Sequence, residues 1–236
     1  MALSRRDFVK LCSGTVAGFG VSQMFHPAIH EAFAQTLTGE RPPVFWVQGQ
    51  GCTGCSVTLL NSTHPSIADV LLKIISLEFH PTVMAAEGEG AYEHMMRVAE
   101  KFKGKFIFAV EGAVPVAHDG KCCVVAEADH HEVTMTEVTK VLAANAAAVL
   151  AVGTCAAYGG IPAGKGNETG AMGVSAFLKK EGIPAPVINI PGCPPHPDWI
   201  VGTIGLGLQA LATNTLGLLV KQGLDANGRP KAFYKN

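Results

Sequence analysis

Three apolar runs in this chain each end in a glycine that is followed, at once or one residue later, by a cysteine. They end at Gly51-Cys52, Gly153-Thr154-Cys155 and Gly192-Cys193, and the first continues to another thiol at Cys55. Near-continuous apolar runs are typical of buried parallel strands, which all point the same way. We therefore expect the four cysteines to meet at the carboxyl edge of one sheet, where α/β proteins place their ligands.

The apolar runs alternate with helical patterns along the chain. Strands are expected at Val44–Gln48, Ile74–Phe79, Lys105–Val110, Ala148–Val152 and Pro186–Ile190. Helices are expected near Val57–Leu60, Ile67–Leu72, Glu87–Phe102, Thr134–Ala147, Ser175–Lys180 and Trp199–Ala212, with Ser56 and Asp198 as caps and a hairpin over Val114–Val125 that turns at Asp119-Gly120. This alternation predicts an α/β fold built on a doubly wound parallel sheet.

The first residues have the pattern of an export signal. Arg5-Arg6 precedes a weakly apolar stretch, and Ala32-Phe33-Ala34 offers the small residues that a signal peptidase reads. We expect residues 1–34 to be a twin-arginine signal peptide and residues 35–236 to form one periplasmic domain. Because this route exports folded proteins, often with a cofactor inserted, the signal also favours a bound cofactor. The formal charge of −1 provides no basic field, so nucleic acid is not expected as a partner.

Four convergent thiolates suit either a 4Fe–4S cluster or a tetrahedral zinc ion. A structural zinc site usually combines two compact CxxC pairs, whereas Cys155 and Cys193 lie 38 positions apart. This split favours a cluster, although zinc, disulfides and buried free thiols remain open from the spacing alone. Cys122 and Cys123 are adjacent and would face opposite sides of a strand, so we interpret them as core residues or half of a disulfide.

Five long motifs carry a resemblance to a known family. They are WVQGQGCTGCSVTLLN at Trp46–Asn61, SLEFHPTVMAAEGE at Ser76–Glu89, VEGAVP at Val110–Pro115, VGTCAAYGGIPA at Val152–Ala163 and PGCPPHPDWIVGT at Pro191–Thr203. In these motifs the chain resembles the small, electron-transferring subunit of periplasmic nickel–iron hydrogenases, nearest the nickel–iron–selenium branch.

The resemblance implies a flavodoxin-like domain in which Cys52, Cys55, Cys155 and Cys193 bind the proximal 4Fe–4S cluster. It also implies a large-subunit partner that holds the nickel–iron site, so no catalytic residue is expected in this chain. The chain would pass electrons between that site, where dihydrogen gives two protons and two electrons, and an external acceptor such as a periplasmic cytochrome c.

The family's small subunit normally continues past a GRPxxFF-like segment into a cysteine-rich domain with two further clusters. Here the segment reads Gly228-Arg229-Pro230-Lys231-Ala232-Phe233-Tyr234, and no cysteine follows Cys193. We therefore expect this sequence to hold one cluster and to lack the two-cluster domain of the family.

Other polar residues are candidates for supporting roles. Glu111, His196 and Thr154 are expected near the cysteine ligands. Glu78, Glu87 and Glu89 are candidates for the same surroundings or for the partner interface, although Glu87 and Glu89 also suit the first turn of a helix. His130-His131 is interpreted as a pair of solvated loop residues.

Two other functions remain open. The cluster-bearing subunit of a quinone-reducing complex shares the fold and the Gly-Cys-Pro-Pro loop, but it would have adjacent cysteines after the first strand and no export signal. A zinc-stabilised periplasmic module without a redox role would use the same four thiols.

Overall fold

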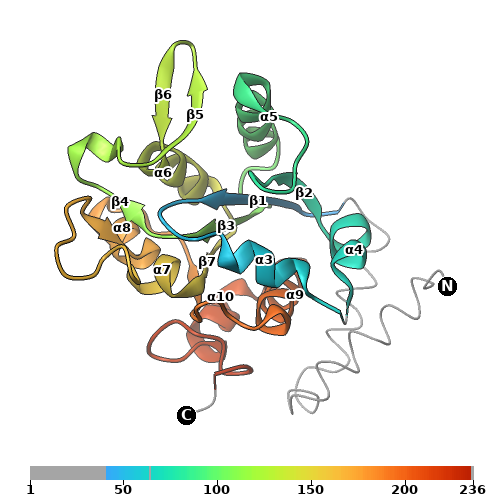
Figure 1. Ribbon diagram of the computed structural model, residues 1–236. Coiled ribbons are helices and arrows are strands. Elements are labelled where there is room, and N and C mark those ends of the chain that lie inside the picture. Colours follow the sequence, from blue (N-terminus) through green and yellow to red (C-terminus); the bar gives the residue numbers. More distant parts are fainter. Residues whose placement is uncertain (1–40, 64, 235–236) are drawn as a thin grey trace.

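The computed structural model describes residues 41–63 and 65–234, and the predicted signal peptide lies outside them. Its centre is a five-stranded parallel sheet (Figure 1). In spatial order the strands are β2 (Ser76–Phe79), β1 (Pro43–Gln48), β3 (Ile107–Glu111), β7 (Ala148–Val152) and β9 (Val187–Ile190). Numbered along the chain, this order is 2-1-3-4-5, as in flavodoxin-like folds. The predicted fold class is confirmed.

The chain reverses its direction of winding between β1 and β3. From β1 it moves outward to β2, and from β3 it proceeds through β7 to β9. These two central strands pair in register from Val44 opposite Ile107 to Gln48 opposite Glu111. Such a reversal opens a crevice at the carboxyl ends of the strands, which is where open α/β sheets bind their ligands.

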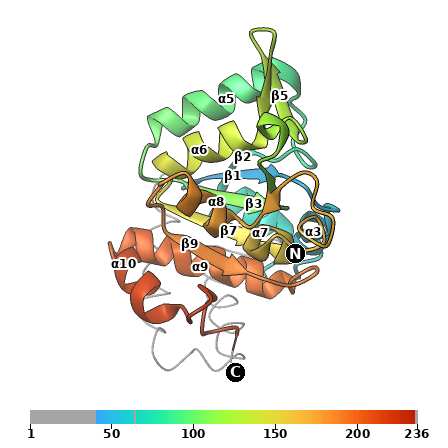
Figure 2. The ribbon, with the colours of Figure 1, turned by 90° about the vertical axis from the view of Figure 1, so that its left-hand side faces the viewer.

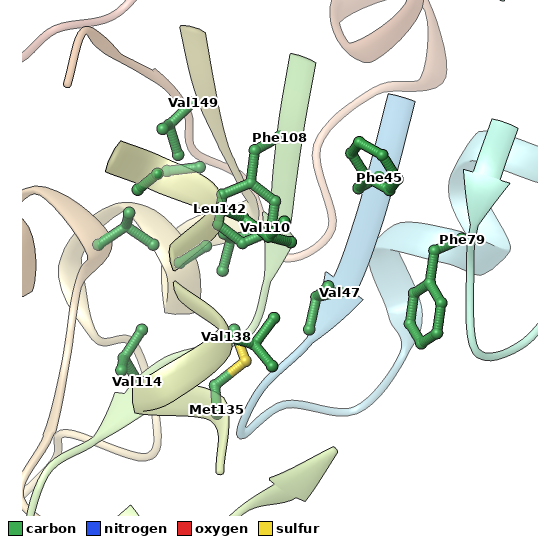
Figure 3. Packing of buried hydrophobic residues seen from close by; sticks show 14 of the residues in the cluster. Phe45, Val47, Phe79, Phe108, Val110, Val114, Met135, Val138, Leu142 and Val149 are labelled. Atoms are coloured by element: carbon green, nitrogen blue, oxygen red, sulfur yellow. The ribbon is translucent and has the colours of Figure 1, made fainter. Parts of the chain in front are cut away.

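Both faces of the sheet are buried because alternate residues of each strand point to opposite sides. Phe45, Phe108 and Val149 face one apolar cluster, which Figure 3 shows from close by. Trp46 and Ile188 face the other cluster, so the central strands carry apolar residues on both faces. This explains why the strands read as continuous apolar runs.

Helices cover the two faces in separate layers (Figures 1 and 2). The face with Phe45 packs against α5 (Gly88–Lys101), α6 (Met135–Asn145), α7 (Gly153–Tyr158) and α8 (Val174–Lys180). The opposite face packs against α3 (Gly54–Leu60), the π-helical turn η1 (Val70–Ile74) that continues α4 (Ile67–Asp69), and α9 (Pro197–Ala212). Two short turns, α10 (Leu216–Leu218) and η3 (Leu219–Gly223), follow α9. Of the described helices, none is both long and apolar enough to cross a membrane.

Helix boundaries differ from the sequence predictions at several points. The helix predicted from Val57 begins at Gly54, so Ser56 lies inside α3 and does not cap it. The last helix begins at Pro197, with His196 and not Asp198 at the cap. The second strand is shorter than predicted, because Ile74 still belongs to the π-helical turn.

The predicted hairpin over Val114–Val125 was wrong. Its first half, β4 (Val114–Pro115), pairs instead with the distant β8 (Ala171–Met172), and η2 (His118–Gly120) follows. The true hairpin joins β5 (Val124–Ala128) to β6 (His131–Thr134) and extends away from the sheet (Figure 2). Its turn residues Asp129 and His130 both have positive φ, the conformation that tight hairpins require.

Candidate metal centre

Four cysteines lie at the carboxyl edge of the sheet, in the segments that follow β1, β7 and β9. Cys52 lies in the turn after β1, and Cys55 lies in the first turn of α3. Cys155 lies in α7, directly after β7, and Cys193 lies in the loop between β9 and α9. Cys52 and Cys193 are exposed, whereas Cys55 and Cys155 are half-buried. All six cysteines of the described part of the chain are free thiols.

These four thiols are close enough to influence one another electrostatically. Burial raises the pKa of the Cys55 thiol, and the Glu111 carboxylate and the other three thiols raise it further. Burial also raises the pKa of Cys155, while the Ile161 amide, which donates to its sulfur, acts in the opposite direction. A thiolate set in such surroundings needs a cation to compensate its charge, as a metal centre does.

Glycines let the backbone pack directly against the sulfurs. A Cβ on Gly153 would overlap with Cys55 Sγ, and one on Gly160 would lie 2.6 Å from Cys155 Sγ. Both residues also have positive φ, which glycine adopts without strain. The observed positions of the two sulfurs therefore require glycine at residues 153 and 160.

The CxxC segment is fastened to the sheet by the buried carboxylate of Glu111. Its Oε1 accepts hydrogen bonds from the Cys55 amide at 2.9 Å and the Ser56 amide at 3.1 Å. Its Oε2 accepts from Trp46 Nε1 at 3.0 Å, from Gln48 Nε2 at 3.2 Å and from the Ser56 hydroxyl. Glu111 is the last residue of β3, so the carboxylate links two strand ends to the first turn of α3.

The segments that carry Cys155 and Cys193 are joined to each other by Thr154. Its amide donates to the Gly192 carbonyl at 2.9 Å, and its hydroxyl accepts from the Gly192 amide at 3.1 Å. This double connection holds the ends of β7 and β9 together directly beside both cysteines.

His80 belongs to the same region, although the sequence alone predicted no role for it. The side chain is 1% exposed and stacks on Trp46 with ring centroids 5.3 Å apart. Its Nδ1 accepts from the Thr82 amide at 3.2 Å, and its Nε2 lies 3.2 Å from Ser56 Oγ. Burial lowers the pKa of His80 to about 4, so the ring is neutral near pH 7. Its position directly after β2 could have marked His80 as a candidate, but its burial and its stacking on Trp46 depend on the tertiary structure.

Other predicted residues have local roles in the structure. His196 caps α9 through Nδ1, which accepts from the Asp198 amide at 3.3 Å, and its ring is exposed. Glu78 binds His94 of α5 at 2.9 Å. Glu89, in the first turn of α5, accepts from the Asp129 amide in the hairpin turn at 3.0 Å.

The remaining candidates lie on other segments of the chain than the four thiols. Glu87 is the residue that precedes α5. His130 occupies the hairpin turn, and His131 of β6 binds Glu137 at 3.2 Å. Cys122 and Cys123 lie between η2 and β5, half-buried and unbridged.

Four thiols are the donor set of a 4Fe–4S cluster and also of a tetrahedral zinc ion. Within residues 41–63 and 65–234, no three His, Cys, Asp or Glu side chains are placed to hold one metal ion. A zinc ion requires its sulfurs within bonding distance of one centre, about 2.3 Å each. A 4Fe–4S cluster takes one thiolate on each of its four irons.

Comparisons with known proteins give one matching family model and several similar relatives. Residues 52–206 match the family described as NADH ubiquinone oxidoreductase, 20 Kd subunit. The chain is 54% identical over 239 residues to the periplasmic [NiFeSe] hydrogenase small subunit of Desulfomicrobium baculatum, covering 99% of this chain and 75% of that protein. It is 39% identical to the periplasmic [NiFe] hydrogenase small subunit of Solidesulfovibrio fructosivorans, covering 98% and 67% of the two chains.

Solved structures give the same result. The recombinant [NiFeSe] hydrogenase of Desulfovibrio vulgaris Hildenborough matches with a TM-score of 0.82 and 68% identity, over 85% of this chain and 72% of that one. The reduced, active Ni-Fe-Se hydrogenase of Desulfomicrobium baculatum matches with a TM-score of 0.80 and 54% identity, over 84% and 72%. The chain therefore belongs to the family of small subunits of heterodimeric [NiFe] and [NiFeSe] hydrogenases.

Proposed function

We propose that Cys52, Cys55, Cys155 and Cys193 bind one 4Fe–4S cluster, through which this subunit passes electrons during reversible hydrogen oxidation. The observation that carries the proposal is that four free thiols follow three strands at one sheet edge. When bound, the cluster supplies a one-electron carrier between the partner's nickel–iron site and an external acceptor. The chain's own residues hold the ligands in place, and the catalytic metal site belongs to the large subunit.

The large subunit would dock over the cysteine edge. Cys52 and Cys193 are exposed there, and apolar side chains beside the ligand segments are exposed as well. Ile161 is 82% exposed, Val57 54% and Tyr158 48%. Exposed apolar side chains that lie together are typical of an interaction surface, and covering them would also exclude water from the cluster.

Replacing Cys155 with alanine tests the ligand assignment. The purified complex carrying Cys155→Ala should lose the iron–sulfur absorption and the EPR signal of the proximal cluster, and hydrogen oxidation should stop. Cys122→Ala is a matched control, because this thiol lies in the turn after η2, outside the ligand segments, and the cluster should remain. A Cys155→Ala complex with full cluster content would refute the assignment. A colourless protein with one zinc would favour the zinc-stabilised module instead.

We further propose export by the twin-arginine route into the periplasm, with residues 1–34 as signal and 35–236 as the cluster domain. The Arg5-Arg6 pair and the periplasmic names of two relatives support this. Changing Arg5 and Arg6 to lysine should leave the complex in the cytoplasm, which cell fractionation measures. Export at the normal level would contradict the proposal.

The external acceptor that we propose is a periplasmic cytochrome c. Purified complex under hydrogen should reduce a periplasmic cytochrome c, and reduction should stop in the Cys155→Ala complex. Failure of the unmodified, hydrogen-oxidising complex to reduce any such cytochrome would contradict this acceptor without affecting the cluster assignment.

A further inference from the structure

Glu111 is a buried carboxylate whose hydrogen-bond partners in the described part of the chain are all donors. The residue is 3% exposed, and its five partners are two backbone amides, an indole N–H, a side-chain amide and a hydroxyl. An ionised carboxylate is a pure acceptor, whereas a protonated one must donate. The surroundings therefore suit the ionised carboxylate, which accepts hydrogen bonds from neutral groups.

The Ser56 hydroxyl is oriented so that its proton goes to Glu111. Gln48 Nε2 lies 2.9 Å from Ser56 Oγ and donates to it. His80 Nε2 is the second neighbour, and it carries the ring proton because Nδ1 accepts from the Thr82 amide. With both lone pairs of the hydroxyl engaged, its only remaining direction is donation to the carboxylate.

The charge lies directly behind a cluster ligand. Glu111 binds the amide of Cys55 itself, and its field reaches both Cys55 and Cys155. The amides of Cys55 and Ser56, which could otherwise donate to sulfur, are both engaged by the carboxylate. Hydrogen bonds to sulfur and local charge are among the factors that set the reduction potential of an iron–sulfur cluster.

We propose that Glu111, oriented by Ser56 and His80, is a positioning residue that fixes the Cys55 segment and lowers the reduction potential of the bound cluster through the negative charge of its carboxylate. Adding one electron to a cluster next to a fixed anion costs more than adding it next to a neutral group, because like charges repel strongly in a buried site. The inference rests on the proposed function, since the cluster is what the charge acts upon.

The test is the midpoint potential of the proximal cluster, followed by EPR during redox titration of the purified complex. Glu111→Gln removes the charge while keeping the length of the side chain and one acceptor oxygen for the two amides. The midpoint potential should move to a higher value than in the unmodified complex. An unchanged or lower potential in a complex with full cluster content would overturn the proposal.

Glu78→Gln is a matched control for the charge change. Glu78 lies on β2, next to Phe79, and Phe79 is opposite Phe45 of β1. Glu111 is opposite Gln48, which lies three residues further along β1. Its carboxylate binds Ser76 and His94 and not the ligand segment. The cluster potential of this variant should equal that of the unmodified complex, and a shift as large as that of Glu111→Gln would contradict a local effect.

Ser56→Ala is a second variant, for which the midpoint potential should change in the opposite direction. It tests the proposal even if the Glu111→Gln complex assembles no cluster. It keeps the carboxylate and removes one of its donors, so the charge is less compensated and the potential should fall. A potential that stays or rises would overturn the proposal. If the unmodified complex itself gives no 4Fe–4S signal, the proposed function fails instead, so the two failures are distinguishable.

Discussion

The two halves of the cysteine edge are held by different chemistry. At Cys55, the carboxylate of Glu111 holds the segment by hydrogen bonds, and it is linked through Ser56 to His80. At Cys155 and Cys193, the amide and the hydroxyl of Thr154 hold the two segments together by hydrogen bonds to Gly192, and no charged group takes part. The first half places an anion behind its sulfur, whereas the second directs the neutral Ile161 amide at its sulfur. Glu111 thus disfavours extra negative charge at the thiols, whereas the Ile161 amide stabilises it.

The largest effect is expected at Gly153, where the two halves touch. Gly153→Ala would push a methyl group into Cys55 Sγ, and a positive φ there adds strain of about 1 kcal/mol or more. The complex should lose its cluster, measured as iron content and EPR signal. Gly166→Ala has the same strain at φ 88°, but open space around its Cβ, and should keep the cluster. Equal cluster content in both variants would show that the contact between the halves is unimportant.

Acid should lower the stability of the protein through His80, which belongs to the first half. The pKa of His80 is lowered to about 4 by burial, against about 6.5 in an unfolded chain. Between these values only the unfolded chain takes up the proton, so stability falls as the pH drops from 6.5 toward 4. The loss at pH 4 is about 3 kcal/mol relative to a variant without this group.

His80→Gln should therefore show a flatter decline of the thermal-unfolding midpoint between pH 6.5 and 4. His130→Asn removes an exposed turn histidine and is the control, with a decline like that of the unmodified protein. Identical slopes in the His80→Gln and unmodified complexes would contradict the neutral, buried state of His80.

The smallest effect is expected in the uncharged half. Thr154→Val removes the acceptor of the Gly192 amide and should cost about 1–2 kcal/mol, the cost typical of one lost hydrogen bond. The rate of cluster loss on mild heating should rise modestly, and the increase over the unmodified complex should be the same at pH 6.5 and at pH 4. Thr154→Ser keeps the hydroxyl and should behave as the unmodified protein. A Thr154→Val complex with unchanged kinetics would mean that the backbone bond alone is sufficient.

Local patterns predicted the sheet because each central strand is buried on both faces and so reads as one apolar run. They failed where pairing is distant. Val114–Pro115 binds Ala171–Met172, far along the chain, and no local signal reveals such a partner. Likewise, Ser56 looked like a helix cap by residue type, but Thr53 in the left-handed region begins the helix earlier. Helix ends depend on backbone geometry that neighbouring segments impose.

The sequence by itself determined the five strands of the sheet, the placement of four thiols at strand ends, and the family. These features depend on residue order and on long motifs. Only the tertiary structure decided what lies beneath the thiols. Glu111 was a candidate, but its five donors come from β1 and α3, and His80 follows β2. Burial and the convergence of distant segments turn ordinary polar residues into one network, and neither is written in local order.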